Sequence, residues 1–233
     1  MTLEEYKEKL EKANSIVFFG GAGVSTESGI PDFRSVDGLY RQKYEYPPET
    51  MLSADFFHAH TDEFFRFYFD KMIYQDAKPN NAHIKLAEWE KTGKLKAVVT
   101  QNIDGLHQMA GSKTVYELHG SVHRNRCIRC GKKYSLDDIL KQKPAVPRCA
   151  CGGIIKPDVV LYGESLPERT VAGAINAIAS ADMLIVGGTS LAVYPAAGFI
   201  SYFNGSPDNL IVINKTVIPG FSNQLNGSLG ELL

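Results

Sequence analysis

The four cysteines of the chain fall into two close pairs, and that spacing suits the ligands of a single metal ion. Cys127 and Cys130 lie in "CIRC", and Cys149 and Cys151 lie in "CAC". Thiolates on such turns can meet one zinc ion at about 2.3 Å. Four of them complete a tetrahedral shell and leave no open position for water or substrate. The pattern therefore predicts a structural zinc ion. The alternatives are unrelated buried thiols and a disulfide framework, which an intracellular chain disfavours.

Gly21 and Gly23 follow an apolar run in the G-x-G spacing that opens many dinucleotide-binding loops. In such loops the glycines let the backbone approach a pyrophosphate, and a helix N-terminus stabilises the anion. The third glycine of the full fingerprint is replaced here by Thr26. An acid, an aromatic ring and a cation come next, namely Asp32, Phe33 and Arg34. The loop favours a ligand with both a ring and a charge; a tight strand-to-helix turn is the alternative.

Three further stretches place polar groups directly after apolar runs. They are "TQNIDGLH", "YELHGS" and "GGTSLAVYPAAG". The first presents Gln101, Asn102 and Asp104, and the second presents His119. Ligands of open parallel sheets collect beyond the carboxyl ends of the strands, so these groups are expected to line one crevice. His119 could act as a general base because an unperturbed histidine has a pKa of about 6.5; a histidine capping a strand end is the alternative.

The elements that would position these groups alternate between strands and helices. Short, continuously apolar runs predict strands buried on both faces, at 15–19, 95–100, 114–118, 182–188 and 209–214. Helical patterns separate most of them, at 3–13 behind a Thr2–Glu5 capping box, 54–74 behind Ser53, 80–91, 168–180 and 194–203. This alternation predicts an α/β fold, with a parallel sheet covered by helices on both faces.

Composition excludes several classes of function. The chain has 233 residues, 44% of them hydrophobic, with 25 basic against 26 acidic residues and a net charge of −1. That balance gives no reason to expect nucleic acid as a direct partner. The charged N-terminus lacks the apolar core of a signal peptide, and no apolar stretch reaches the roughly 18 residues of a membrane span. A soluble, cytoplasmic and monomeric protein is expected.

Taken in chain order, the motifs resemble those of the sirtuins, which are NAD-dependent protein-lysine deacylases. The resemblance rests on "GAGVSTESGIPDFRS", "TQNIDGLH", "YELHGS", the two cysteine pairs, "KPDVVLYGESLP" and "GTSLAVYPA". It extends from Ser15 to about Asn214, and the compact length is similar to that of the bacterial and archaeal enzymes.

The resemblance implies a variant Rossmann domain and a smaller domain. The NAD-binding domain would comprise residues 1–35, 77–119 and 161–233. The small domain would combine a helical insert at 36–76 with a zinc-ribbon module at 120–160.

The resemblance also implies a reaction in which NAD is a consumed co-substrate and no hydride moves. The acyl-lysine carbonyl oxygen attacks the anomeric carbon of the nicotinamide ribose, nicotinamide leaves, and the acyl group ends on ADP-ribose. Acetylated protein lysines are the expected substrates. Desuccinylating relatives carry Tyr and Arg three residues apart, and Tyr68 and Lys71 have that spacing here. Because lysine cannot fork a carboxylate as arginine does, deacetylation is favoured over desuccinylation.

By the same resemblance, each site residue has an expected role. His119 would be the catalytic base, Asn102 would act at the nicotinamide ribose with Gln101, and Ile103 and Asp104 would hold the nicotinamide carboxamide. The remaining cofactor contacts would be Gly21, Ala22, Gly23, Thr26, Asp32, Phe33, Arg34, Gly188, Thr189, Ser190, Asn214 and Lys215. The acyl-lysine groove would be lined by Val160, Tyr162, Gly163 and Val193. The other histidines are expected to be structural, namely His58, His60, His83, His107 and His123.

Two positions depart from the family pattern. Tyr162 stands where the family usually has phenylalanine, which adds a hydroxyl that needs water or a partner. The C-terminus "FSNQLNGSLGELL" is short, and the adenine-side contact expected near Leu229 is matched only loosely.

Three other functions compete with deacetylation. A hydride-transferring dehydrogenase would need the missing third glycine and an acid after the next strand. A nucleic-acid-binding zinc module would leave the large α/β body unexplained. Mono-ADP-ribosyl transfer would use the same NAD site and the same His119, so only its products distinguish it.

Overall fold

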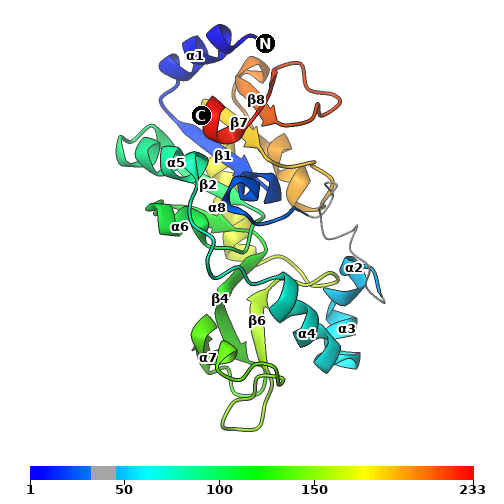
Figure 1. Ribbon diagram of the computed structural model, residues 1–233. Helices are drawn as coiled ribbons and strands as arrows, with labels where there is room; N and C mark the ends of the chain where they lie inside the picture. Colours follow the sequence, from blue (N-terminus) through cyan, green and yellow to red (C-terminus); the bar gives the residue numbers. More distant parts are fainter. Residues whose placement is uncertain (33–45) are drawn as a thin grey trace.

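The computed structural model describes residues 1–32 and 46–233, which form two lobes (Figure 1). The larger lobe contains both termini and a six-stranded sheet. The smaller lobe contains a three-stranded sheet and a group of short helices. Phe33 and Arg34, two of the expected cofactor residues, lie outside the described part of the chain.

The large sheet is entirely parallel. Its strands are β1 (Ile16–Gly20), β2 (Leu95–Thr100), β3 (Val115–Glu117), β7 (Met183–Gly187), β8 (Leu210–Asn214) and β9 (Gln224–Asn226). They lie in the order β3-β2-β1-β7-β8-β9, and each neighbouring pair runs parallel. Counted along the chain within this sheet, that order is 3-2-1-4-5-6, the order of a Rossmann fold. The predicted α/β class is confirmed, and the strand order reverses between β1 and β7.

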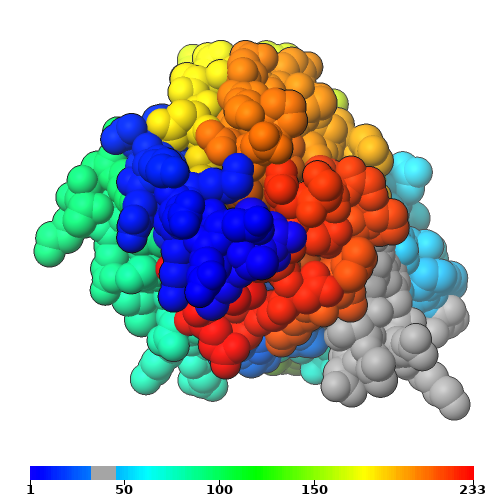
Figure 2. All heavy atoms as spheres, turned by 90° about the horizontal axis from the view of Figure 1, so that it is seen from above, coloured from blue at the N-terminus to red at the C-terminus, as the bar shows by residue number. Residues whose placement is uncertain are grey.

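Helices cover both faces of the sheet. The bounds are α1 (Leu3–Lys12), α5 (Asn81–Lys91) and α9 (Leu229–Leu232) on one face, and α8 (Glu168–Ser180) and the 3₁₀ helix η4 (Ala196–Tyr202) on the other. In β1, Ile16 and Phe18 join the first core, whereas Val17 and Phe19 join the second. All four side chains are fully buried, as the continuous apolar run predicts. Figure 2 shows the N-terminal residues lying beside the C-terminal ones at this end of the lobe.

Local capping signals are confirmed where the sequence predicted them. The hydroxyl of Thr2 accepts a hydrogen bond from the backbone N–H of Glu5, whose carboxylate accepts one from the N–H of Thr2 in return.

The pattern at 194–203 forms a 3₁₀ helix, η4, in place of an α-helix. It contains Gly198 and several aromatic or β-branched residues, which are weak α-helix formers.

The prediction of one continuous helix over 54–74 is wrong. The chain forms α3 (Ala54–Ala59) and α4 (Thr61–Lys71), with a break at His60, where φ is −132° and ψ is 53°. The break lets Phe57 of the first helix pack edge-to-face on Phe64 of the second at 5.0 Å between ring centroids. Both rings are buried, so core packing overrides the local preference for a straight helix.

The small lobe has a single core. Its antiparallel sheet runs in the order β5-β4-β6, and its bounds are β4 (Gly120–Cys127), β5 (Lys133–Ser135), β6 (Ile155–Val159), α2 (Pro48–Met51) and α7 (Leu136–Leu140). Aromatic side chains of α3 and α4 pack with Ile139 of α7 and Ile155 of β6. The helices after β1 and the module with the cysteines therefore bury one shared surface.

The remaining elements of the described residues are short. They are η1 (Ala22–Val24), η2 (Thr26–Ser28), α6 (Leu106–Ala110) and η5 (Pro207–Asn209). Across the described residues, no helix has both the length and the apolar character needed to cross a bilayer.

Candidate functional site

The carboxyl ends of the central strands lie level with one another. In the sheet register, Gly20 stands opposite both Thr100 and Gly187, and Thr100 stands opposite Glu117. The next backbone groups continue this alignment, because the N–H of Gln101 donates to the carbonyl of Gly20 at 3.0 Å. The segments after β1, β2, β3 and β7 therefore leave the sheet at one edge, around the point where the strand order reverses. Ligands of open α/β sheets bind at such an edge.

The glycines of the first loop pack directly against the loop after β7. The N–H of Gly23 donates to the carbonyl of Gly188 at 2.7 Å. A Cβ atom at Gly23 would lie 2.8 Å from the Cα of Gly188, and one at Gly21 would lie 2.8 Å from the Cβ of Thr189. Gly188 itself has a φ of +58°, a conformation that suits glycine. These glycines are thus required for the contact between the two loops.

Thr26 has a defined role at the position of the missing third glycine. It begins η2, and its hydroxyl donates to the carbonyl of Gly23 at 3.0 Å. The first loop therefore continues as two turns of 3₁₀ helix, η1 and η2, instead of entering a long α-helix. Asn80, the N-cap of α5, donates from Nδ2 to the carbonyl of Val24 at 2.8 Å. This bond ties the loop to the start of α5.

Ser25 links two of the expected site residues, and sequence reasoning gave it no role. Its fully buried hydroxyl donates to Oδ2 of Asp104 at 2.7 Å and accepts from Nδ2 of Asn102 at 3.0 Å. The other carboxylate oxygen of Asp104 accepts from the N–H of Leu106 at 2.9 Å. Each carboxylate oxygen has a second lone pair and can accept one further donor. The signal for Ser25 was a small hydroxyl residue inside a glycine loop.

His119 lies at the end of β3 with one ring nitrogen already bound. Its Nδ1 lies 2.9 Å from the backbone carbonyl of Gln101. A carbonyl oxygen only accepts, so Nδ1 carries the proton and Nε2 of the neutral ring is an acceptor. Burial lowers the pKa of His119 below its usual value, although the hydrogen bond to Gln101 partly opposes that shift. The histidine is therefore neutral at pH 7 and able to take up a proton.

The side chain of Gln101 extends toward the loop after β7. Its Nε2 donates to the hydroxyl of Thr189 at 3.1 Å, and that hydroxyl also accepts from the N–H of Leu191. Gln101 thus connects His119, through its carbonyl, with the second glycine loop, through its side chain. These contacts join segments that are far apart in the sequence.

The segment expected to bind substrate begins beside His119. The N–H of Val160 donates to the carbonyl of His119 at 3.0 Å. Beyond it, Tyr162 forms a parallel bridge with Ser53, and its carbonyl accepts from the N–H of Ala54 at 2.9 Å. The Tyr162 side chain is 40% exposed, so its hydroxyl can meet water. Gly163 follows with a φ of +90°.

A carboxylate holds the bend of this segment. Oε2 of Glu164 accepts from the N–H of Leu161 at 2.8 Å and from Nζ of Lys156 at 3.0 Å. Lys156 also donates to the carbonyl of Val159 at 3.0 Å. The path of the chain past Val160 is therefore fixed by its own side chains.

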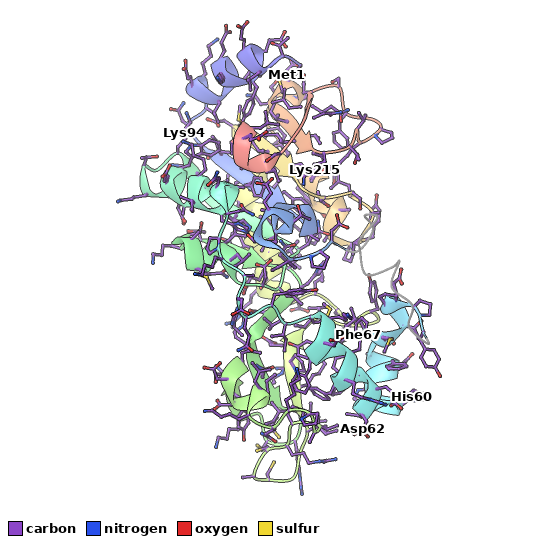
Figure 3. The ribbon with its side chains drawn as sticks, viewed as in Figure 1. Met1, His60, Asp62, Phe67, Lys94 and Lys215 are labelled. Atoms are coloured by element: carbon purple, nitrogen blue, oxygen red, sulfur yellow. The ribbon has the colours of Figure 1, made fainter. Side chains whose placement is uncertain are left out.

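Other expected site residues have the following surroundings. Asn214 ends β8, where its Nδ2 donates to the carbonyl of Thr216 at 3.2 Å, and Lys215 is exposed in the large lobe (Figure 3). Val193, Ala22 and Ile103 are half-buried, as is Asp32, and Ser190 is exposed. Leu229 is buried in the core of the first sheet face, so its side chain serves packing.

Tyr68 and Lys71 do not form an exposed pair for an acyl carboxylate. The Tyr68 side chain is 1% exposed and packs against Phe64 and Phe65. Nζ of Lys71 lies 3.0 Å from a carboxylate oxygen of Asp70. Burial in this aromatic core raises the pKa of Tyr68.

Two buried histidines, one in α5 and one in α6, contact each other. The rings of His83 and His107 are 4.7 Å apart between centroids, and both side chains are almost fully buried. Burial lowers the pKa of His83 to about 4 and that of His107 to about 3; Asp104 partly opposes the shift of His83. Both rings are neutral at pH 7, in keeping with the structural role expected of them.

The four cysteines meet at one point of the small lobe. Sγ of Cys127 lies 3.5 Å from that of Cys151, Sγ of Cys130 lies 3.6 Å from that of Cys149, and all four lie within 4.8 Å of one another. A disulfide needs about 2.05 Å, whereas tetrahedral zinc with 2.3 Å bonds places sulfur atoms about 3.8 Å apart. The cluster therefore has the size of a zinc site and not of a disulfide pair.

Two similar turns present these thiols. The N–H of Gly131 donates to the carbonyl of Cys127 at 2.9 Å, and the N–H of Gly152 donates to the carbonyl of Cys149 at 2.8 Å. The backbone N–H of Cys151 and then the hydroxyl of Tyr134 lower the pKa of Cys149 to about 6. Thiolate, the form that binds zinc, is favoured at that position.

Comparisons with known proteins agree with this geometry. A sequence model described as the Sir2 family matches residues 21–195. The chain is 57% identical to an NAD-dependent protein deacetylase of Clostridium acetobutylicum, over 99% of this chain and 96% of that one. It is 56% identical to an NAD-dependent protein deacetylase of Clostridium perfringens, over the same shares of the two chains.

Solved structures show the same similarity. A Sir2 complex with a p53 peptide and NAD+ has a TM-score of 0.87 and 39% identity, covering 99% of this chain and 95% of that one. A Sir2 bound to acetylated peptide has a TM-score of 0.85 and 38% identity, with the same coverage. The family match over most of the chain, together with relatives similar along almost the whole length, shows that this chain belongs to the Sir2 family.

Proposed function

We propose that this chain is an NAD-dependent protein-lysine deacetylase, which moves the acetyl group of an acetyl-lysine to the ADP-ribose part of NAD. Acetyl-lysine, NAD and water are consumed, and free lysine, nicotinamide and O-acetyl-ADP-ribose are released. The bond between nicotinamide and ribose breaks, and the acetyl oxygen forms the new bond to that ribose. Relatives that are 56–57% identical carry the name of this activity, and similar Sir2 structures hold NAD or an acetylated peptide.

The observation that carries the proposal is the orientation of His119. Its Nδ1 is committed to the Gln101 carbonyl at 2.9 Å, so Nε2 is the basic atom of the ring. Because burial lowers its pKa, the ring is neutral and ready to accept a proton at pH 7. We assign to it the removal of a proton from a ribose hydroxyl, which lets that oxygen capture the acyl carbon.

Asn102 and Asp104 are assigned to the nicotinamide end of NAD. Ser25 holds both side chains, so they reach the site with fixed geometry. Asp104 retains acceptor capacity for the NH₂ of a carboxamide. We assign Asn102 and Gln101 to the ribose. The two glycine loops, with Thr26 and Thr189 beside them, are assigned to the phosphates, because glycines let the backbone approach a pyrophosphate closely.

The acyl-lysine is assigned to the segment that begins at Val160. The bond between Val160 and His119 places that segment next to the base, and an extended peptide can add to it as a further strand. Such pairing reads the peptide backbone and places few demands on its sequence. Val193 and Gly163 are assigned to the same groove.

The zinc ion is assigned a structural role. Cys127, Cys130, Cys149 and Cys151 would complete its shell, and bound zinc would fix the two cysteine turns of the small lobe. Reduced cysteines suit a reducing compartment, so we assign the protein to the cytoplasm. We also propose that it is a monomer. We also assign residues 1–35, 77–119 and 161–233 to the NAD domain, and 36–76 and 120–160 to the small domain.

The proposal is tested by incubating the protein with NAD and an acetyl-lysine peptide while measuring nicotinamide and peptide mass. Nicotinamide release should require the peptide and should accompany loss of the acetyl mass. His119→Ala should lower the rate by about 10²- to 10⁴-fold, the usual contribution of a general base. His58→Ala, at an exposed histidine of α3, is the matched control and should retain the wild-type rate. Nicotinamide release without loss of the acetyl mass would contradict the proposal.

A further inference from the structure

A groove on the outer side of the small lobe shares Tyr162 with the substrate segment, whereas its other described lining residues have no assigned role in the sites above. Its volume is about 550 Å³, and the segment after β6 meets α2 and α3 there. The side chains that define its chemistry are four rings and two carboxylates, namely Tyr46, Phe56, His60, Tyr162, Glu49 and Asp55. Figure 3 shows His60 at the outer edge of the α3–α4 pair, on the side turned away from β4 and β6.

Three of the four rings, those of Tyr46, Phe56 and His60, contact one another. His60 stacks on Phe56 at 4.8 Å between ring centroids, and Tyr46 meets Phe56 edge-on at 5.3 Å. Tyr46 is 36% exposed and Tyr162 is 40% exposed, so both large side chains present apolar surface to the solvent. Exposed aromatic side chains gathered in a groove are typical of a surface that binds a ligand or another protein.

The groove lining also contains two carboxylates. Glu49 is half-buried and Asp55 is exposed. Within the part of the chain that the structure describes, neither carboxylate is in an ion pair, and no lysine or arginine lines the groove. Carboxylates and aromatic rings in one groove both attract a cation, the carboxylates through their charge and the rings through their negative faces.

The groove is continuous with the substrate segment through Tyr162. The side chain of Tyr162 lines the groove, while its backbone N–H donates to Leu52 at 2.9 Å and its carbonyl accepts from Ala54. Tyr162 is two residues from Val160, whose N–H is bonded to His119. A peptide that adds to this segment as a strand would rise by about 3.3 Å per residue. Every second side chain of the peptide would point to the same face of the sheet. A residue near the acetyl-lysine would therefore pass the mouth of the groove.

We propose that this groove is a flanking subsite that binds the cationic side chain of a lysine or arginine close to the acetyl-lysine in the substrate protein. The inference rests on the proposed deacetylase function and adds a substrate preference to it. The carboxylates of Glu49 and Asp55 would face the charge, and the rings of Tyr46, Phe56 and Tyr162 would cover the apolar stem.

The test compares acetyl-lysine peptides that carry one arginine, moved one position at a time along either flank, with matched peptides carrying glutamine. The wild-type protein should favour arginine at one or two positions by about three- to tenfold in kcat/KM, the range of one or two exposed charge contacts. The preference should lie in KM and should shrink at high salt, because the groove is open to solvent. A glutamate at the same position should be disfavoured.

The variant Glu49→Gln/Asp55→Asn should bring the arginine-to-glutamine ratio at that position close to one. Asp62→Asn is the matched control, because Asp62 is an exposed acid in the first turn of α4, as Asp55 is in α3, and does not line the groove. That control should keep the wild-type ratio, and urea denaturation of both variants checks that they fold.

The outcomes separate the two proposals. Turnover of every peptide with no arginine preference at any position would overturn the subsite and leave the deacetylase function standing. A preference that survives in Glu49→Gln/Asp55→Asn would also overturn it, because the recognition would then lie elsewhere. If no peptide is deacetylated, the proposed function fails and the subsite fails with it.

Discussion

Removing the hydroxyl of Ser25 should damage both stability and activity, although this residue is not expected to touch either substrate. Ser25→Ala deletes the hydrogen bond to Oδ2 of Asp104 at 2.7 Å and the one from Nδ2 of Asn102 at 3.0 Å. A bond to a charged group contributes about 1.5–3 kcal/mol, and a neutral one about 0.5–1.5 kcal/mol. Because Ser25 is fully buried, water cannot easily replace either bond. The free energy of unfolding should fall by about 2–4 kcal/mol.

The activity of Ser25→Ala should fall further than its stability requires. Asp104 would keep its bond from Leu106, and Asn102 would keep its backbone bond to the Thr100 hydroxyl, so both residues would remain near the site but less well oriented. A misplacement of this kind can lower kcat/KM by about 10²-fold. The assays are urea denaturation and steady-state deacetylation at a temperature where the variant is folded.

Ser28→Ala is the matched control for this prediction. The Ser28 hydroxyl accepts a single bond, from Nδ2 of Asn80 at 3.0 Å, and that Nδ2 also donates to Val24. The control should lose less than about 1 kcal/mol and should retain its kcat/KM. If Ser25→Ala behaved like Ser28→Ala, the hydroxyl would not be the link that orients Asn102 and Asp104.

Four further predictions follow from the site and the fold. When kcat/KM is measured against pH, its fall on the acidic side should have a midpoint below pH 6.5, because burial lowers the pKa of His119 and only the neutral ring accepts a proton. A midpoint above the usual histidine pKa of about 6.5 would contradict this role. The free energy of unfolding should fall by about 3 kcal/mol or more between pH 6.5 and pH 4, because the unfolded state binds protons at His83 and His107 that the folded state excludes; acid titration of the urea midpoint measures it, and a flat profile would contradict it. A strong zinc chelator should remove one equivalent of metal and unfold the small lobe, with activity and circular dichroism falling together; activity lost from an intact fold would indicate a catalytic metal instead. Gly23→Ala should destabilise the protein by about 1–3 kcal/mol and weaken NAD binding, since its Cβ would lie 2.8 Å from Gly188; calorimetry measures both, and wild-type values would show that the two loops can separate freely.

The sequence predicts best where the pattern is local and strong. The apolar run at 95–100 forms β2 with the same bounds, and the helical pattern at 168–180 forms α8 with the same bounds. The cysteine pairs converge because short turns leave their thiols few other arrangements. The Thr2–Glu5 capping box is likewise a contact between residues three apart.

The sequence predicts poorly where distant contacts decide. β9 has three residues, two of them the polar Gln224 and Asn226, and it forms only because β8 offers an edge. The break at His60 depends on the core that α3 and α4 share with α7 and the sheet of the small lobe. Ser25 gains its role from Asp104, which follows a different strand. Each of these features needs a partner that no local pattern reveals.

The fate of the acetyl group tests the central claim most directly. A peptide with a ¹³C-labelled acetyl-lysine is incubated with NAD and the protein, and all products are quantified by mass spectrometry. The account predicts that the label appears on O-acetyl-ADP-ribose in a one-to-one ratio with nicotinamide and free lysine. Label recovered as free acetate from the start, with no nicotinamide released, would contradict it.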